Sequence, residues 1–203
     1  MSSSYVHPTA IVEEGASIGE GARIWHFAHV RSSARIGAEV NLGKDVYIDS
    51  DVSLGQGARV QNGVSIYHGV HVADWCFIGP YVVFTNDIAP RVGNKTWRVV
   101  ETHLQTGSSL GAGVIVKCGV TVGSFAMVGA GAIVTHDIPP FHLAVGVPAR
   151  PVKKVCACGQ SFLPIETPSD EYLRDCCREN MDPRVRAAAE EAIARLVTVE
   201  AAV

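Results

Sequence analysis

Two residues whose types suit proton transfer and substrate orientation, His68 and Asn86, stand 18 positions apart in the chain. The imidazole of a histidine can accept a proton near neutral pH. The amide of an asparagine offers one acceptor and one donor group but cannot act as a base. The two residues can work together only if the fold places positions at this interval side by side.

Basic residues that suit anion binding occur at two places. Arg31 follows His26 and His29, and its fork of N–H donors matches a diphosphate or a carboxylate. A second basic cluster comprises Arg150, Lys153 and Lys154. Such cations suit phosphate contact, but they are also common on solvated turns, where they contribute little. Histidines at corners are often structural, so the residue types alone leave both interpretations open.

Four of the six cysteines lie near the end of the chain, as Cys156-Ala157-Cys158 and Cys176-Cys177. A zinc ribbon normally carries two CxxC knuckles, whereas one knuckle here is CxC and the other is CC. Two interpretations of this segment therefore remain open: the cysteines bind zinc, or they are free thiols. We predict that no metal is required for the chemistry itself.

A hydrophobic residue recurs at every sixth position over most of the chain, and this rhythm predicts the fold. The 19 positions, all aliphatic or Phe, are Val12, Ile18, Ile24, Val30, Ile36, Leu42, Ile48, Leu54, Val60, Ile66, Val72, Ile78, Phe84, Leu104, Leu110, Val116, Val122, Val128 and Val134. A small or β-branched residue comes two places earlier, and Gly often comes one place later. A period of six fits neither a helix nor simple strand alternation; it is typical of a parallel β-helix.

Each six-residue unit should form one side of a triangular coil. The periodic residue and the small residue two places before it point inward, because side chains alternate along an extended strand. Three units close a coil, and successive coils stack about 4.8 Å apart. We expect the Gly after the periodic residue to turn the corner, because Gly adopts backbone conformations that strain other residues. His68 and Asn86 both come two places after a periodic residue, so they should share one corner of neighbouring coils.

The rhythm breaks at residues 85–103, which are polar and contain Pro and Gly. A tolerated surface loop is one interpretation, since insertions of this kind cost a fold little. We favour a loop that covers a cleft, because loops on rigid scaffolds often carry function and because this one begins beside Asn86.

Composition limits the remaining possibilities. The net charge is −3 and no run of Lys or Arg occurs, which argues against nucleic-acid partners. No stretch has 18 uninterrupted apolar residues, so we expect no membrane partner. The first ten residues lack the basic and apolar regions of a signal peptide. Cysteines without such a signal indicate a reducing compartment, and we expect a cytoplasmic location.

The sequence predicts two regions, a β-helix domain at 1–152 with the loop 85–103, and a C-terminal tail at 153–203. Pro139, Pro140 and Pro151 should end the coil, because proline cannot donate to a further rung. Within the tail, residues 183–198 form an amphipathic pattern that Asp182-Pro183 would open as cap and first turn. The expected fold class is therefore all-β, with a short, partly helical tail.

Several motifs resemble one known superfamily. They are WHFAHV at 25–30, QNGVSIY at 61–67, Gly79-Pro80 with FTN at 84–86, VGAGA at 128–132 and GVPAR at 146–150. With the six-residue pattern of about residues 6–152, they resemble the hexapeptide-repeat acyltransferases. The branch they resemble acetylates nucleotide-linked 3-amino sugars, such as UDP-2-acetamido-3-amino-2,3-dideoxy-glucuronate. The chain departs from this branch at His68, where an acidic residue is more usual, and in the loop after Asn86.

The resemblance implies a left-handed β-helix, although the period alone does not decide the handedness. It also implies a homotrimer with active sites between neighbouring prisms. The implied activity is N-acetyl transfer from acetyl-CoA, a co-substrate, to a sugar amine in polysaccharide biosynthesis.

The resemblance further implies roles for individual residues. Asn86 would orient the acceptor amine, and His68 would accept a proton. The residues expected to bind the nucleotide sugar are His26, His29, Arg31, Gln61, Tyr67 and Arg91. Those expected along coenzyme A are Gly111, Ala112, Gly129 and Ala130, with Arg150, Lys153 and Lys154 near its phosphates. Backbone N–H groups near Gly111 or Gly129 are candidates to stabilise an oxyanion.

Three alternatives remain. An O-acetyltransferase on the same scaffold would need a genuine general base for its hydroxyl acceptor. A metalloenzyme similar to the γ-class carbonic anhydrases would need three imidazoles on one zinc, and the histidine pair that is typical of that family, with members five places apart, does not occur. A non-catalytic trimeric module would bind no acetyl-CoA.

Overall fold

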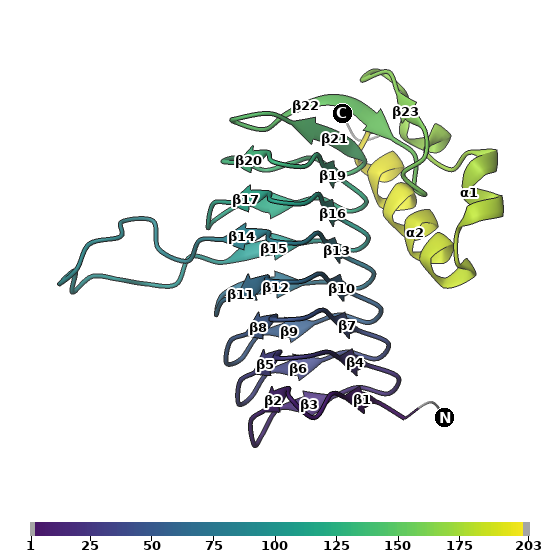
Figure 1. Ribbon diagram of the computed structural model, residues 1–203. Coiled ribbons are helices and arrows are strands. Elements are labelled where there is room, and N and C mark those ends of the chain that lie inside the picture. Colours follow the sequence, from purple (N-terminus) through teal and green to yellow (C-terminus); the bar gives the residue numbers. More distant parts are fainter. Residues whose placement is uncertain (1–2, 201–203) are drawn as a thin grey trace.

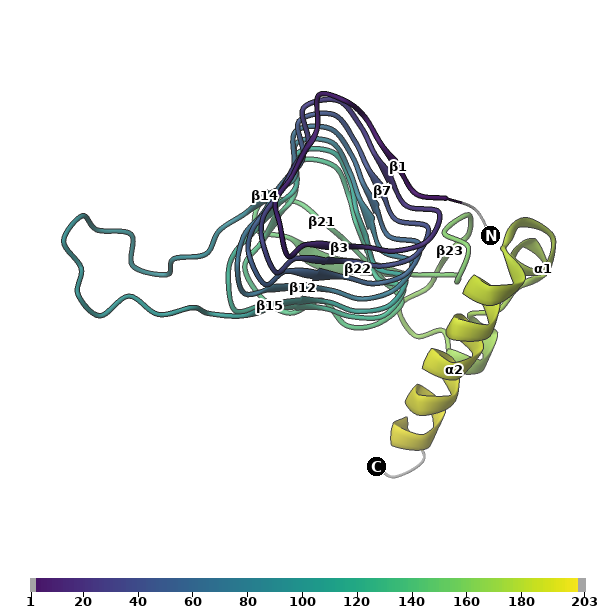
Figure 2. The same ribbon diagram turned by 90° about the horizontal axis from the view of Figure 1, so that it is seen from below.

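The structure is a computed structural model that describes residues 3–200. The chain winds into a triangular stack of coils, with a long loop leaving one corner and a helical tail lying against another (Figures 1 and 2). Figure 2 looks along the stack from its N-terminal end. From β1 (Tyr5–Val6) the chain turns counter-clockwise as it recedes, so the β-helix is left-handed.

Three sheets form the sides of the prism, and strands β2 to β20 each end on a residue of the six-residue rhythm. Sheet A contains β1, β4 (Arg23–Ile24), β7 (Asn41–Leu42), β10 (Arg59–Val60), β13 (Phe77–Ile78), β16 (Ser109–Leu110), β19 (Met127–Val128), β21 (His142–Val145), β22 (Arg150–Val155) and β23 (Phe162–Leu163). Sheet B contains β2 (Ile11–Val12), β5 (His29–Val30), β8 (Tyr47–Ile48), β11 (Ser65–Ile66), β14 (Val83–Phe84), β17 (Ile115–Val116) and β20 (Ile133–Val134). Sheet C contains β3 (Ser17–Ile18), β6 (Arg35–Ile36), β9 (Ser53–Leu54), β12 (Val70–Val72), β15 (Thr102–Leu104) and β18 (Thr121–Val122).

The core runs along the axis of the prism, as the sequence predicts. Periodic residues such as Ile24 and Ile78 are fully buried, and so are the small residues two places before them, such as Ala22 and Ala28. Parallel pairing joins equivalent positions of successive coils, for example Arg23 with Asn41. The first coil is less covered, because it has a neighbour on one side alone.

The glycines that follow the periodic residues do not turn the corners, contrary to the prediction from the sequence. The left-handed backbone conformation falls three places after the periodic residue, and residues other than Gly adopt it there, among them Phe27, Asp51 and Trp75. The Gly directly after the periodic residue is needed for space instead. A Cβ on Gly55 would lie 2.4 Å from the backbone of Ala73 and Asp74 in the next coil. The coils stack too closely at this position for any side chain.

The loop enters the stack at the corner between sheets B and C. Pairing normally advances 18 positions along the chain, as from Arg23 to Asn41. From Val70 of β12 to Thr102 of β15 it advances 32 positions, so the loop lengthens this one coil by 14 positions. Thr102 and His103 belong to β15, and the loop therefore ends earlier than the predicted 85–103.

The stack ends where β22 pairs antiparallel with β21. The tail follows with β23, the 3₁₀ helix η1 (Ser169–Glu171), α1 (Asp175–Asn180) and α2 (Pro183–Glu200). Strand β22 crosses the predicted boundary at 152, so the two regions share it. In the part of the chain that the structure describes, no helix has the length and apolar character needed to cross a bilayer.

The tail lies against the corner between sheets C and A and packs there in a small hydrophobic core that includes two residues of the prism. That core comprises Phe125, Phe141, Leu163, Tyr172, Ala189 and Ile193. The Asp182 carboxylate accepts the backbone N–H of Arg184 at 2.8 Å and so caps α2, as predicted. The Arg184 guanidinium pairs with Glu39 and lies 4.9 Å from the centre of the Trp75 ring.

Candidate functional site

The corner between sheets B and C, hereafter the B–C corner, carries a continuous network of polar side chains. Its lowest member is Glu13, whose carboxylate accepts the Ser32 N–H at 2.9 Å and lies 2.8 Å from His29 Nε2. Arg31 Nε lies 2.8 Å from the same carboxylate. Two of the predicted sugar-binding residues, His29 and Arg31, are thus held by one acid.

The network continues upward through Tyr47 and Asp49. Arg31 donates to the Tyr47 hydroxyl at 3.1 Å, and that hydroxyl donates to Asp49 Oδ1 at 3.1 Å. Asp49 Oδ2 accepts the backbone N–H of His68 at 3.2 Å. The rings of Tyr47 and Tyr67 have centres 6.2 Å apart, so Tyr67 borders the network as well.

His68 is held in one tautomer by the backbone. Its Nδ1 lies 3.1 Å from the carbonyl oxygen of Ser50. A carbonyl oxygen only accepts, so Nδ1 carries the proton and Nε2 of the neutral ring keeps its lone pair. The side chain is exposed, and its Nε2 can therefore accept a proton from a substrate.

Asn86 occupies the equivalent position one coil further along. Ser65 of β11 pairs with Val83 of β14, and His68 and Asn86 each come three places after these paired residues. Asn86 is half-buried, and the loop begins beside it. Among residues 3–200, none forms a hydrogen bond with its side-chain amide. This amide is free to meet a ligand.

The network keeps its acids ionised. The Ser32 N–H and then His29 lower the pKa of Glu13 to about 2. Burial alone would raise the pKa of Asp49, but the N–H groups of Ser50 and His68 and the Tyr47 hydroxyl outweigh it and leave that pKa lowered. Two carboxylates thus stay negative around the Arg31 guanidinium, whose own pKa is raised by Tyr47 and Glu13.

A second group of predicted residues lies on the corner between sheets A and B, hereafter the A–B corner. These residues are His26, Gln61, Gly111, Ala112, Gly129 and Ala130, which follow strands of sheet A. His26 stacks on His7 with ring centres 3.5 Å apart. A strand of sheet B separates this corner from His68 and Asn86 in the same coil. One chain alone does not bring the two groups together.

Of the backbone N–H groups near Gly111 and Gly129, those of the two glycines themselves are engaged. Their N–H groups donate to the carbonyls of Val128 and Ala144, at 2.8 and 2.9 Å, as part of coil stacking. The next N–H groups, of Ala112 and Ala130, have no acceptor among the described residues 3–200. These two donors stand one coil apart on an exposed corner and could bind successive groups of an extended ligand.

The basic cluster near the end of the stack is divided. Arg150 and Lys153 are exposed on β22. Lys154 donates to the Tyr172 hydroxyl, with its ammonium 5.1 Å from the centre of the Tyr172 ring. Arg150 and Lys153 can meet a phosphate, whereas Lys154 is already engaged in the tail. Arg91 is exposed in the loop.

Sequence reasoning did not single out Glu13, Tyr47 and Asp49. Glu13, Arg31 and Asp49 follow one another at intervals of 18 positions and alternate in charge. The same counting that relates His68 to Asn86 would have found this ladder.

The histidines do not form a three-imidazole metal site within one chain. His71 and His103 stack with ring centres 4.8 Å apart, and Glu101 lies 3.5 Å from Nε2 of each. In the described residues no third histidine joins this group. A groove of about 420 Å³ lies on sheet C beside His71 and His103 and reaches Ala73 and Gln105, which follow strands of this sheet. A larger groove, about 890 Å³, lies on sheet A near Arg59, and its lining includes Trp25, the residue before His26.

Solved structures similar to this chain include three transferases. PerB from Caulobacter crescentus, in complex with CoA and GDP-perosamine, is 24% identical, with 74% of this chain and 57% of that chain covered and a TM-score of 0.48. The acetyltransferase domain of PglB from Neisseria gonorrhoeae, in complex with acetyl coenzyme A, is 23% identical, with 73% and 57% covered and a TM-score of 0.49. A single-residue mutant of AntD, an N-acyltransferase from Bacillus cereus, in complex with dTDP and coenzyme A, is 20% identical, with 75% and 83% covered and a TM-score of 0.48.

The chain spans 57% of the length of the first two of these proteins. None of the curated proteins compared matches it. Two family models match parts of the prism. Bacterial transferase hexapeptide (six repeats) matches residues 51–86, and the hexapeptide repeat of succinyl-transferase matches residues 33–68 and 106–136. Residues 33–86 and 106–136 of the prism therefore match models of hexapeptide repeats found in transferases.

Proposed function

We propose that the protein is an acetyl-CoA-dependent N-acetyltransferase acting on the amine of a nucleotide-linked 3-amino sugar, and that it works as a cytoplasmic homotrimer. The observation that carries the proposal is the B–C corner. There His68, held with Nε2 free, and the unengaged amide of Asn86 stand on successive coils where the loop departs. The match to transferase hexapeptide repeats supports acyl transfer as the chemistry.

The reaction follows from these groups. The neutral amine attacks the thioester carbonyl, a C–N bond forms, and the carbonyl oxygen becomes an oxyanion. Collapse of this intermediate breaks the C–S bond and releases the coenzyme as a thiolate. Asn86 holds the amine so that its lone pair faces the thioester, which removes part of the barrier by orientation. Nε2 of His68 accepts the proton that the amine loses.

The sites for the two substrates are proposed on the two corners. Arg31, fixed by Glu13 and Tyr47, suits a diphosphate or sugar carboxylate. On the A–B corner, the free N–H groups of Ala112 and Ala130 suit carbonyl oxygens of the pantetheine arm. Arg150 and Lys153 suit its phosphates. Because the two corners lie apart within a single chain, a complete site would form between two subunits.

The outer face of sheet B supports this assembly. Ile11, Val83 and Ile115 point outward from it and are exposed. Apolar residues aligned on one face of a prism favour contact with another protein surface. A neighbouring subunit on this face would bring its A–B corner toward the B–C corner of the first.

The proposal is tested by a substrate screen. The full chain is incubated with acetyl-CoA and a panel of UDP- and dTDP-linked amino sugars, and release of free thiol is followed. We expect turnover with a 3-amino sugar. Turnover with none of them would overturn the proposed substrate, and absence of acetyl-CoA binding in calorimetry would support a non-catalytic module instead.

Asn86→Ala should lower kcat about 10²-fold, because the amine loses its orientation. The KM for acetyl-CoA should change little. Asn94→Ala is a matched control in the same loop, since its side chain bonds to Ala89 and Thr96 within the loop. Equal kcat values for the two variants would contradict the role of Asn86.

O-acetylation is the second candidate, because Nε2 of His68 is free to act as a general base. A hydroxyl acceptor would depend on this base far more than an amine does. If His68→Ala abolishes transfer and Asn86→Ala has little effect, the O-acetyl assignment is favoured.

A further inference from the structure

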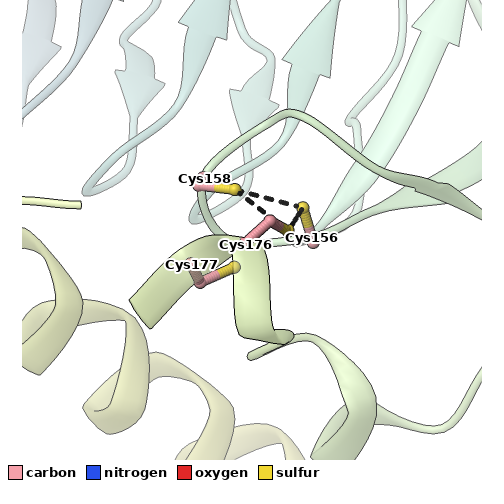
Figure 3. A group of neighbouring side chains, drawn as sticks. All are labelled: Cys156, Cys158, Cys176 and Cys177. Atoms are coloured by element: carbon pink, nitrogen blue, oxygen red, sulfur yellow. Dashed lines mark hydrogen bonds between the residues drawn. The ribbon is translucent and has the colours of Figure 1, made fainter. Parts of the chain in front are cut away.

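Four cysteines of the tail converge on one point, although they come from two separate segments of the chain. Cys156 and Cys158 lie in the turn after β22, and Cys176 and Cys177 lie in the first turn of α1 (Figure 3). Cys156 and Cys177 are buried, and the other two are half-buried. The four Sγ atoms all lie within 4.8 Å of one another.

The spacing of the sulfur atoms matches a tetrahedral metal site. Zinc binds thiolate at about 2.3 Å, which places the corners of an ideal ZnS₄ tetrahedron about 3.8 Å apart. The Sγ of Cys156 lies 3.5 Å from that of Cys158 and 3.7 Å from that of Cys176, and the last two are 3.5 Å apart. These three sulfur atoms thus form one face of the tetrahedron, and Cys177 supplies the fourth corner.

We propose that Cys156, Cys158, Cys176 and Cys177 bind one structural zinc ion. Four protein ligands leave no open coordination position, as in zinc sites that stabilise a fold rather than catalyse a reaction. The irregular CxC and CC spacing does not prevent this arrangement. The turn after β22 and the helical start of α1 aim each pair of sulfurs at the same point.

The surroundings supply hydrogen bonds to the sulfurs. The backbone N–H of Ser161 donates to Cys156 Sγ at 3.2 Å, and the Ser161 hydroxyl lies 3.5 Å from Cys176 Sγ. A zinc-bound thiolate can only accept, so this hydroxyl would donate to it. Such donors orient metal ligands and spread their negative charge.

The ion would stabilise a region whose own core is small. Among the described residues, the tail contributes four buried side chains to the cluster that it shares with Phe125 and Phe141 of the prism, and units with so small a core usually need a metal or a disulfide. The zinc would tie the end of β22 to α1. Because α2 follows α1 directly, it would also fix the segment that carries Arg184 to Glu39 and Trp75.

The cluster lies in the tail, which covers the C–A corner, whereas His68 and Asn86 lie on the B–C corner and Ala112 and Ala130 on the A–B corner. Of the residues proposed to bind the coenzyme, Arg150 and Lys153 share strand β22 with the segment before Cys156. The zinc proposal does not rest on the proposed function. Metal content can be measured whether or not a substrate is known.

The test measures zinc in the full chain purified under reducing conditions without a metal-affinity step. We expect one zinc ion per chain. The double variant Cys158→Ser/Cys176→Ser should lose it, and Cys118→Ala, a buried cysteine of the prism outside the cluster, should retain it. Replacement of zinc by Co²⁺ should give the sulfur-to-cobalt charge-transfer and visible bands of tetrahedral thiolate coordination.

A second measurement uses the wild-type chain, so that the test does not depend on whether the double variant folds. Removal of zinc by a chelator should make the peptide bonds after Arg174 and Arg178 cleavable by trypsin, and added Zn²⁺ should restore their protection. The proposal is overturned if the protein holds no zinc, or if iron occupies the site. Zinc retained by the double variant overturns it as well. So do disulfides among the four cysteines, which a mass reduced by two hydrogens per bond would reveal.

Discussion

At the scale of single residues, the B–C corner is ordered because its charged side chains and His68 have partners that hold them. Ser50 sets the tautomer of His68 through a backbone carbonyl, and Asp49 holds its backbone N–H. Arg31 is held from both sides, by Glu13 below and Tyr47 above. A fixed guanidinium loses little freedom when it binds an anion, which favours affinity.

The ionised state of Glu13 leads to a prediction about stability and pH. Its pKa in the folded protein is about 2, below its ordinary value of 4.5. Its stabilising contribution is therefore present above pH 4.5 and is lost as the pH falls toward 2. We expect the urea midpoint of the wild type to fall in this window. The midpoint of Glu13→Gln should fall less over the same pH range. An equal fall of the urea midpoint with pH in the two proteins would contradict the role of this carboxylate.

At the scale of structural elements, the coils can stack closely because glycines such as Gly55 have no side chain at the contact between them. Gly55→Ala places a Cβ 2.4 Å from the backbone of the next coil. The coils cannot separate without breaking their hydrogen bonds, so we expect a loss of about 3 kcal/mol or more in the free energy of unfolding. Denaturant unfolding of the purified variant measures it.

Gly113→Ala is the matched control for this prediction. Gly113 has a φ of +67°, and a Cβ added to it would meet no atom within 4 Å. The variant should lose only about 1–2 kcal/mol, the cost of a left-handed conformation. A loss in Gly55→Ala no larger than that in Gly113→Ala would contradict the steric explanation for Gly55.

The loop can be removed without breaking the rhythm. Deletion of residues 87–100 takes out the whole insertion and restores the regular offset of one coil between Val70 and Thr102. We expect the coils to form with a stability close to that of the wild type, because the shorter connection closes more easily. Transfer to the amino sugar should be lost. Circular dichroism melting checks the stability, and the thiol-release assay checks the loss of transfer. Retained turnover would show that the loop does not cover the site.

The sequence predicts the strands, the core and the shared corner of His68 and Asn86, because the six-residue spacing fixes which residues point inward. It does not predict why Gly55 is a glycine, since the close contact is made by the next coil of the stack. The separation of Gly111 from His68 also follows from the six-residue spacing, but only once each six-residue unit is assigned to one of the three sheets. The convergence of Cys156 with Cys176 depends on tail turns that have no period at all.

At the scale of the whole molecule, the three corners have different partners. The tail covers the C–A corner, and the other two remain accessible in a single chain. A complete acyl-transfer site would use the B–C corner of one subunit and the A–B corner of its neighbour. This division predicts that two inactive variants can complement each other.

Complementation can be measured with Asn86→Ala and Ala130→Glu. The first removes the orienting amide, and the second places a charged side chain on the exposed A–B corner. Each variant alone should be nearly inactive. Mixed trimers from equal amounts should recover about one quarter of the wild-type rate, because a site needs one intact corner from each of two neighbours. No recovery in mixed trimers would place both corners' functions within one subunit.

The antiparallel pairing of β22 on β21 has a consequence for self-association. A stack of parallel coils presents at its open end a row of unpaired backbone groups, which can template growth into a fibre. The chain closes this C-terminal end by reversing direction. The exposed strand then carries Arg150, Pro151 and Lys153, and charged residues and proline are the types that discourage further pairing. The part of β22 that β23 does not cover thus keeps a repeat that could grow indefinitely as a molecule of fixed length.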